Sequence, residues 1–213
     1  MEVIDAIETR TSIRKFGDDP VEDEDLKTML RAATRAPNPG NRQQWHFIVV
    51  KNKDVLRQMR EAVESETWKL IEAAKERHMM EEAKEVRSRL SVFLFFEDAP
   101  LTIAVCERID PPDGRARIWQ AMGLSPSEID RLRPARVLQG IGAAIENLTL
   151  AAISLGYGTC WMTGPLIAVH QLEEILEVKP PHRLIALIPV GRPAQHPALR
   201  PRKSVEEVMS VIA

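Results

Sequence analysis

Residues 136–155 read RVLQGIGAAIENLTLAAISL, and this stretch decides the fold class. It is long enough for about five helical turns, and its glycines and alanines allow another helix or a second subunit to approach closely. Its length and apolar character would also suit a membrane span, but Gln139, Glu146 and Asn147 interrupt it. We therefore expect a central helix that is buried within a folded domain.

Short β-rich segments occur on both sides of this helix, and each is bounded by residues typical of loops. They lie too far apart in the sequence to pair as hairpins, so helices must separate them. Because helical patterns far exceed strand patterns, we predict an α+β fold, a small sheet wrapped by helices with one helix buried all round. The four expected strands are Trp45–Val50, Ala99–Cys106, Gly158–Met162 and Leu184–Val190.

Two further segments are expected to be mainly helical. The segment 54–98 is highly charged and has no Pro or Gly before Pro100, which is typical of a solvated helical excursion, although a partner-binding surface is an alternative. The segment 110–133 begins as a loop and then carries a capping box at Ser125–Glu128, with Pro126 at the first helical position. Neither segment shows a composition shift that would mark a linker, so we expect one domain over residues 1–213.

Composition excludes several classes of protein. Lys and Arg total 29 against 31 for Asp and Glu, and this near-neutral balance argues against a nucleic-acid surface. Cys106 and Cys160 lie in apolar surroundings and are interpreted as buried reduced thiols, while the five histidines lack metal-ligand spacing. Because that spacing is absent, we expect no metal site. The N-terminus lacks the basic-then-apolar layout of a secretion signal, so we expect a cytoplasmic protein with no membrane segment.

The pair Gly140 and Gly142 forms a Gly-x-Gly pattern, but it does not indicate a dinucleotide site. No strand precedes it, Ile145 occupies the position of the third glycine, and the pattern lies in the middle of a helix. Close packing against another helix or subunit explains these glycines better.

Three loops and a C-terminal cluster carry groups suited to a phosphate-bearing heteroaromatic ligand. Arg10–Phe16 (RTSIRKF) supplies two guanidinium groups, which bind phosphate through paired hydrogen bonds, and two hydroxyls. Ala36–Phe47 (APNPGNRQQWHF) supplies amides that both donate and accept hydrogen bonds. Gly156–Pro165 (GYGTCWMTGP) ends in a turn that exposes backbone N–H groups, and Arg200–Lys203 (RPRK) suits an anion.

Together, and in this order, the four segments resemble the nitroreductase family of flavin mononucleotide (FMN) enzymes. In the family's Ala-Pro-Ser-x-x-Asn-x-Gln-Pro-Trp-x-Phe motif, Asn38 replaces Ser and Gln44 replaces Pro, which alters the expected pocket without abolishing it. In the terminal Arg-x-Pro-Leu-Glu-Glu-Val pattern, Ser204 replaces Pro. The matching residues are Arg10, Ser12, Arg14 and Phe16; Ala36, Pro37, Asn41, Gln43, Trp45 and Phe47; Gly156, Gly158, Thr159 and Trp161; and Arg202, Glu206, Glu207 and Val208.

The resemblance implies a mainly antiparallel sheet and an obligate homodimer, with the central helix and two FMN molecules at the subunit interface. It implies that Arg10 and Arg202 hold the flavin phosphate with Ser12 nearby, and that Arg14 faces the pyrimidine edge of the ring. The backbone at Thr163 and Gly164 would donate to flavin N5, while the prolines and Asn38 would come from the partner subunit. The full set implied for FMN binding is Arg10, Thr11, Ser12, Arg14, Pro37, Asn38, Pro39, Asn41, Gln43, Thr163, Gly164 and Arg202.

The resemblance also implies a function. It indicates an oxidoreductase that transfers hydride from NADH or NADPH through FMN to an electron-poor small molecule, such as a nitroaromatic or quinone, with ping-pong kinetics. No protein side chain is expected to act as acid, base or nucleophile, because the flavin carries the chemistry. Alternatives are enone reduction, dehalogenation, oxygen-dependent flavin breakdown or a non-catalytic flavin-binding dimer. The two helical segments would border the substrate, where Trp68 and Trp119 either cap the slot or pack in the core.

Overall fold

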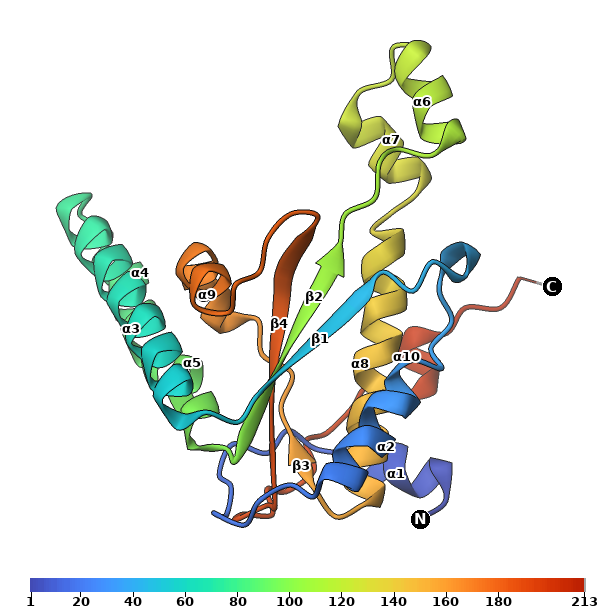
Figure 1. Ribbon diagram of the computed structural model, residues 1–213. Coiled ribbons are helices and arrows are strands. Elements are labelled where there is room, and N and C mark those ends of the chain that lie inside the picture. Colours follow the sequence, from blue (N-terminus) through green and yellow to red (C-terminus); the bar gives the residue numbers. More distant parts are fainter. Residues whose placement is uncertain (213) are drawn as a thin grey trace.

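The computed structural model describes residues 1–212 and contains a four-stranded antiparallel sheet with helices on both faces (Figure 1). The strand order is β1-β2-β4-β3, and all three neighbouring pairs are antiparallel. The predicted α+β class and the small antiparallel sheet are therefore confirmed. The strands are β1 (Trp45–Val50), β2 (Leu101–Arg108), β3 (Gly158–Thr159) and β4 (His182–Gly191).

Strand β3 is shorter than the predicted segment Gly158–Met162, and the reason lies in its partner strand. Gly158 pairs with Gly191, Thr159 pairs with Val190, and an isolated bridge between Met162 and Leu187 keeps the same register. This register places position 160 opposite position 189 of β4, which is a proline without an N–H group to donate. The ladder is therefore interrupted after Thr159 and resumes for one pair only.

Most of the expected helices form, with bounds set by local capping. The predicted excursion 54–98 is helical and is divided into three helices and a 3-10 turn, with His78 in the left-handed region at the first break. The predicted capping box at Ser125–Glu128 is present, and a second one forms at Ser204–Glu207. The helices are α1 (Val3–Thr9), α2 (Asp23–Ala33), η1 (Pro39–Asn41), α3 (Lys53–Glu76), α4 (Met80–Ser88), α5 (Leu90–Leu94), η2 (Phe95–Asp98), α6 (Gly114–Ala121), α7 (Pro126–Leu132), α8 (Arg136–Ser154), η3 (Gly164–Ala168), α9 (Val169–Ile175) and α10 (Val205–Val208).

The hydrophobic core consists of two clusters that share the sheet. Helices α2 and α8 cover one face, and α3, α5, η3 and α9 cover the other (Figure 1). Strand β2 contributes to both, because alternate side chains point to opposite faces of a sheet. Ile103 and Val105 face α8, whereas Ala104 and Cys106 face the opposite cluster, and all four are fully buried.

Helix α8 packs along the sheet with one side buried, including Ile141, Ile145 and Leu148. Among the described residues it is the one helix that is long and apolar enough to cross a membrane, yet its contacts are those of a core helix. Within one chain it is not buried all round as expected, because Leu138 on its other side is 40% exposed. Burial on every side would require a second chain.

The glycines of α8 admit neighbours from the same chain. A Cβ on Gly140 would lie 3.1 Å from Cβ of Asn38 and 3.3 Å from the carbonyl oxygen of Pro37, and a Cβ on Gly142 would lie 3.4 Å from the ring of Trp161. The small residues therefore let a loop and an aromatic side chain approach the helix. A second subunit at this surface remains a separate expectation.

Candidate functional site

Five of the predicted cofactor residues meet in one pocket of about 680 Å³, called here the arginine pocket. Its walls come from the segment that follows α1, from the middle of α8, and from the extended strap after β4. Four arginines face two carboxylates in this lining, so the pocket favours an anion. The lining residues are Ile7, Glu8, Arg10, Thr11, Ser12, Arg14, Glu146, Leu199, Arg200 and Arg202.

The first wall of the arginine pocket is held on the sheet by backbone pairing. Ser12 forms a parallel bridge with Thr159, and the N–H of Ile13 donates to the Thr159 carbonyl oxygen over 2.9 Å. Ile13 fits because Gly158 has no side chain: a Cβ there would lie 2.5 to 2.9 Å from three atoms of Ile13. This pairing directs Arg10 and Arg14 from an otherwise irregular segment into the pocket.

The strap after β4 brings the C-terminal basic cluster to the same place. Pro193 bridges to Phe16, and the N–H of Ala194 donates to the carbonyl oxygen of Lys15 over 3.0 Å. The strap then runs on to Arg200 and Arg202, which line the arginine pocket. Residues from the two ends of the chain therefore share one anion site.

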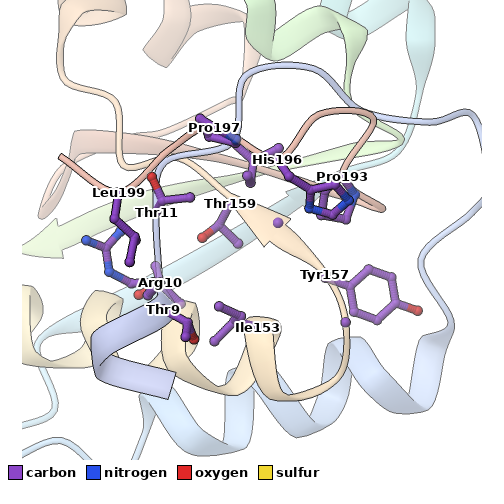
Figure 2. Close-up of a pocket in the computed structure, with 14 residues that line it drawn as sticks. Thr9, Arg10, Thr11, Ile153, Tyr157, Thr159, Pro193, His196, Pro197 and Leu199 are labelled. Atoms are coloured by element: carbon purple, nitrogen blue, oxygen red, sulfur yellow. The ribbon is translucent and has the colours of Figure 1, made fainter. Parts of the chain in front are cut away.

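A second, mainly apolar pocket of about 420 Å³ adjoins the arginine pocket (Figure 2). Both are lined by Arg10, Thr11 and Leu199. Tyr157 forms part of its wall, and the Arg192 guanidinium lies 3.9 Å from the centre of that ring. The phenol hydroxyl donates to Asp25 over 2.9 Å, so this wall is fixed by both ends of the tyrosine side chain.

Thr163 and Gly164 lie at a turn that exposes backbone donors, as the sequence predicts. Helix η3 begins at Gly164, and first-turn N–H groups have no acceptor within their own helix. Among the backbone hydrogen bonds of residues 1–212, neither the Thr163 nor the Gly164 N–H is a donor. Gly164 also packs against the ring of Phe93, which leaves no room for a side chain. The turn can therefore donate to an acceptor on a ligand.

Thr163 lines a groove of about 560 Å³ that lies between α8 on one side and η3, α9 and β4 on the other. Leu138, Gly142, Ile145 and Trp161 provide its apolar wall, and Trp161 is 46% exposed. A planar aromatic ligand could rest against such a surface. The segment 159–163 relates the two cavities: Thr159 pairs with Ser12, which lines the arginine pocket, and Trp161 and Thr163 line the groove.

The predicted residues Pro37, Asn38, Pro39, Asn41 and Gln43 lie elsewhere in the chain. They line neither the arginine pocket nor the groove, and their loop packs against α8 at Gly140 instead. Within the loop, Oδ1 of Asn38 accepts from the N–H of Gln43 over 2.9 Å. Asn41 and Gln43 both have positive φ, a conformation that side chains rarely adopt and that often marks a functional loop. A single chain therefore presents this loop away from its own arginine pocket.

The two thiols lack the character of nucleophiles. Burial raises the pKa of Cys106 to about 11. Burial also raises the pKa of Cys160, although Arg14 and Ser12 beside it oppose the shift. Both cysteines are buried and free, as predicted, and at neutral pH they are protonated. Among residues 1–212, no group of three His, Cys, Asp or Glu side chains could hold a metal ion.

The helical excursion 110–133 projects beyond the end of the sheet (Figure 1), and Asp113 joins it to α8. The Asp113 carboxylate accepts from Arg133 over 2.9 and 2.6 Å and lies 3.4 Å from Arg136. The hydrogen bonds from Arg133, together with the one from the Ala116 N–H, hold the pKa of Asp113 down to about 2. The joint is therefore ionised throughout the neutral range.

Trp68 and Trp119 belong to neither hydrophobic cluster, so ordinary core packing does not describe them. Each lies under an arginine instead: Arg87 is 5.7 Å from the centre of the Trp68 ring, and Arg133 is 5.9 Å from that of Trp119. Whether either ring caps a substrate remains a prediction.

Five residues of the arginine pocket were not among the predicted binding residues: Ile7, Glu8, Glu146, Leu199 and Arg200. Two of them carried a signal in the sequence. Arg200 carried a signal, since it belongs to the basic cluster Arg200–Lys203. Glu146 also carried one, because it is the only ionised side chain between residues 137 and 172. The role of Glu146 depends on which side chain it contacts, and only the structure shows that contact.

Known proteins of one family are similar to this chain in sequence and in fold. The Nitroreductase family profile matches residues 7–192. A protein of Methanothermobacter thermautotrophicus, provisionally named NADH dehydrogenase/NAD(P)H nitroreductase, is 30% identical over 207 residues, 94% of this chain and 82% of its own length. An iodotyrosine deiodinase of Nematostella vectensis is 26% identical over 209 residues, 96% of this chain and 72% of its own. The crystal structure of a BluB-like flavoprotein of Clostridium difficile 630 superposes with a TM-score of 0.90, at 32% identity and full coverage of both chains.

Proposed function

The chain belongs to the nitroreductase family, and we propose that it is an FMN-dependent oxidoreductase acting on an electron-poor small molecule. The observation that carries the proposal is the arginine pocket, where Arg10, Arg14, Arg200 and Arg202 meet beside the hydroxyl residues Thr11 and Ser12. Four guanidinium groups in a pocket of this size suit one phosphate monoester. The similar flavoprotein structure supports flavin as the group that carries it.

FMN fits the residues that the chain provides. Arg10 and Arg202 would hold the phosphate in the arginine pocket. The Ser12–Thr159 pairing connects that pocket to the segment whose Thr163 lines the groove. At the groove, the N–H groups of Thr163 and Gly164 would donate to the ring edge. From the arginine pocket, Arg14 would stabilise negative charge on the ring. When bound, FMN would supply hydride transfer between NADH or NADPH and an acceptor.

We also propose that two chains form the complete site. The loop with Pro37, Asn38, Pro39, Asn41 and Gln43 lies away from its own arginine pocket, and α8 leaves an apolar side uncovered at Leu138. A homodimer that pairs the exposed sides of α8 would cover this surface and would bring the loop of one chain to the site of the other. The partner chain would then exclude water from one face of the flavin ring.

Dehalogenation is the second candidate, and the iodotyrosine deiodinase relatives favour it. They are 23 to 27% identical over at least 95% of this chain. The same cofactor site would serve either reaction, because the groups described above contact the flavin and not the acceptor. The two candidates therefore differ only in the acceptor.

The test is made on the purified protein. We expect a yellow protein with a flavin absorbance band that bleaches under anaerobic NADH or NADPH. The bleached protein is then mixed with a nitroarene, a quinone, an enone, a halophenol or 3-iodotyrosine, and reoxidation and iodide release are followed. Fast reoxidation by nitroarene or quinone supports the first candidate, and iodide release supports the second.

Steady-state kinetics test whether donor and acceptor share one slot. Parallel double-reciprocal lines are expected, because nicotinamide and acceptor must occupy the same face of the ring in turn. Intersecting lines would contradict the shared slot. A colourless protein that binds no added FMN would contradict the proposed function itself.

A further inference from the structure

We propose that Glu146 is a positioning residue that orients Arg10 toward the phosphate of FMN, an inference that rests on the proposed function. Glu146 is the only ionised side chain on the long apolar stretch 137–172, yet it lines a pocket whose chemistry selects anions. A carboxylate there repels phosphate, so its presence requires a compensating role. The contact with Arg10 supplies that role.

The geometry places the carboxylate on one side of the guanidinium. Oε1 of Glu146 lies 3.5 Å from Nε of Arg10. Oε2 accepts from the Thr149 hydroxyl over 3.3 Å, and the same hydroxyl lies 3.0 Å from the Glu146 carbonyl oxygen. Thr149 is buried one turn along α8, and its hydroxyl hydrogen lies between these two acceptors, so it is one neighbour of a carboxylate whose side chain is otherwise 46% exposed. Glu146 is therefore held by a rigid helix rather than by a loop.

A guanidinium group presents its donors along flat edges in a fixed fork. A carboxylate on the Nε side leaves the edge between the two terminal nitrogens free for two parallel hydrogen bonds to phosphate oxygens. Arg10 follows the end of α1, and its side chain is 25% exposed, so without Glu146 it would sample other rotamers. Orienting it before the ligand arrives lowers the entropy cost of binding.

The role of Glu146 is tested by its dependence on the phosphate and on Arg10. Dissociation constants for FMN and for riboflavin, which lacks the phosphate, are measured by fluorescence on flavin-depleted protein. Glu146→Gln removes the charge at nearly constant size. We expect it to weaken FMN binding roughly two- to fivefold, the range of a partly exposed ion pair, and to leave riboflavin binding unchanged. In an Arg10→Ala background, Glu146→Gln is expected to have no further effect on FMN.

Glu85→Gln is the matched control. Glu85 pairs with Arg89 on α4 over 3.2 Å, remote from the arginine pocket, so its loss should change neither constant. Thermal unfolding of each variant separates a binding effect from a general loss of stability. A merely structural Glu146 would weaken FMN and riboflavin together.

Each remaining outcome overturns the inference. Tighter FMN binding by Glu146→Gln would mean that the carboxylate only opposes the phosphate. Equal weakening of FMN and riboflavin binding would mean that Glu146 contacts the sugar-alcohol chain or only supports the folded structure. If Glu146→Gln weakened FMN binding just as much in the Arg10→Ala background, Glu146 would not act through Arg10. Normal FMN binding that Glu146→Gln does not alter refutes this inference alone, whereas a wild-type protein that binds no FMN refutes the proposed function as well.

Discussion

The backbone N–H of Ile13 donates to the carbonyl oxygen of Thr159 over 2.9 Å, and this bond joins the N-terminal segment to the short strand β3. On one side of the bond lies Arg10, in the arginine pocket, and on the other lies Thr163, at the turn with free donors. The two halves of the candidate site are therefore connected through one backbone contact. Gly158 makes the contact possible.

Gly158→Ala should disrupt both stability and flavin binding. The new Cβ would lie within 2.9 Å of three Ile13 atoms, so the segment that carries Arg10 and Arg14 must shift. Overpacking of this kind costs about 1–3 kcal/mol. We expect a lower midpoint in chemical denaturation and weaker FMN binding. Gly114→Ala is the control, because nothing lies within 4 Å of a Cβ there. Unchanged FMN affinity in Gly158→Ala would show that the Ile13–Thr159 contact does not support the proposed FMN site.

Arg10→Ala and Arg202→Ala should each weaken FMN binding roughly ten- to a hundredfold, because a charge-assisted contact contributes about 1.5–3 kcal/mol. Both variants should fold, since neither side chain belongs to a hydrophobic cluster. Fluorescence titration gives the affinity, and circular dichroism checks the fold. Arg57→Ala, on the exposed surface of α3, is the control and should bind FMN normally. Full affinity in both pocket variants would leave the phosphate site without support.

Asp113→Asn should loosen the excursion 110–133 at neutral pH. Its pKa is held at about 2 by the hydrogen bonds from Arg133, so the wild-type carboxylate is ionised from about pH 4 upward. A depressed pKa means that the stabilisation is fully present above the ordinary Asp value and is lost as the pH falls toward 2. We expect faster limited proteolysis within 110–133 for Asp113→Asn, and no change for the wild type between pH 5 and 8.

The control for this experiment is Asp54→Asn, which removes an exposed pair with Arg57 on α3. Its proteolysis within 110–133 should match that of the wild type. An Asp113→Asn protein cut no faster than this control would show that the salt bridge does not hold the excursion.

Leu138→Glu should separate the proposed dimer without damaging the fold of one chain. Leu138 is 40% exposed and lies in the groove along α8, so a charge there is tolerated in a monomer but costly in a buried interface. Gly142→Glu would be a poorer test, because a Cβ there already meets Trp161 at 3.4 Å in the same chain. Size-exclusion chromatography with light scattering should give a dimer for the wild type and a monomer with weak flavin binding for Leu138→Glu.

Leu70→Glu is the matched control, since Leu70 is 46% exposed on the remote helix α3 and should leave the dimer intact. A wild-type monomer that retains flavin would refute the shared site.

The sequence by itself determined the elements whose signals are local. Strand β1 forms over the predicted residues Trp45–Val50, and both capping boxes form where Ser and Glu lie three residues apart. The order of four short motifs also identified the family. Such signals survive in a single sequence because each depends on residues a few positions apart.

Only the tertiary structure decided which distant residues meet. Pro189 interrupts β3 because the register places it opposite position 160. No pattern within Gly158–Met162 predicts this interruption. Gly142 admits Trp161 of its own chain, and Glu146 pairs with Arg10, a residue from the first turns of the chain. These relations depend on backbone pairing and packing between segments far apart in sequence, which local propensity does not encode. The sequence thus identified the groups suited to bind a flavin, and the fold determined which of them one chain brings together.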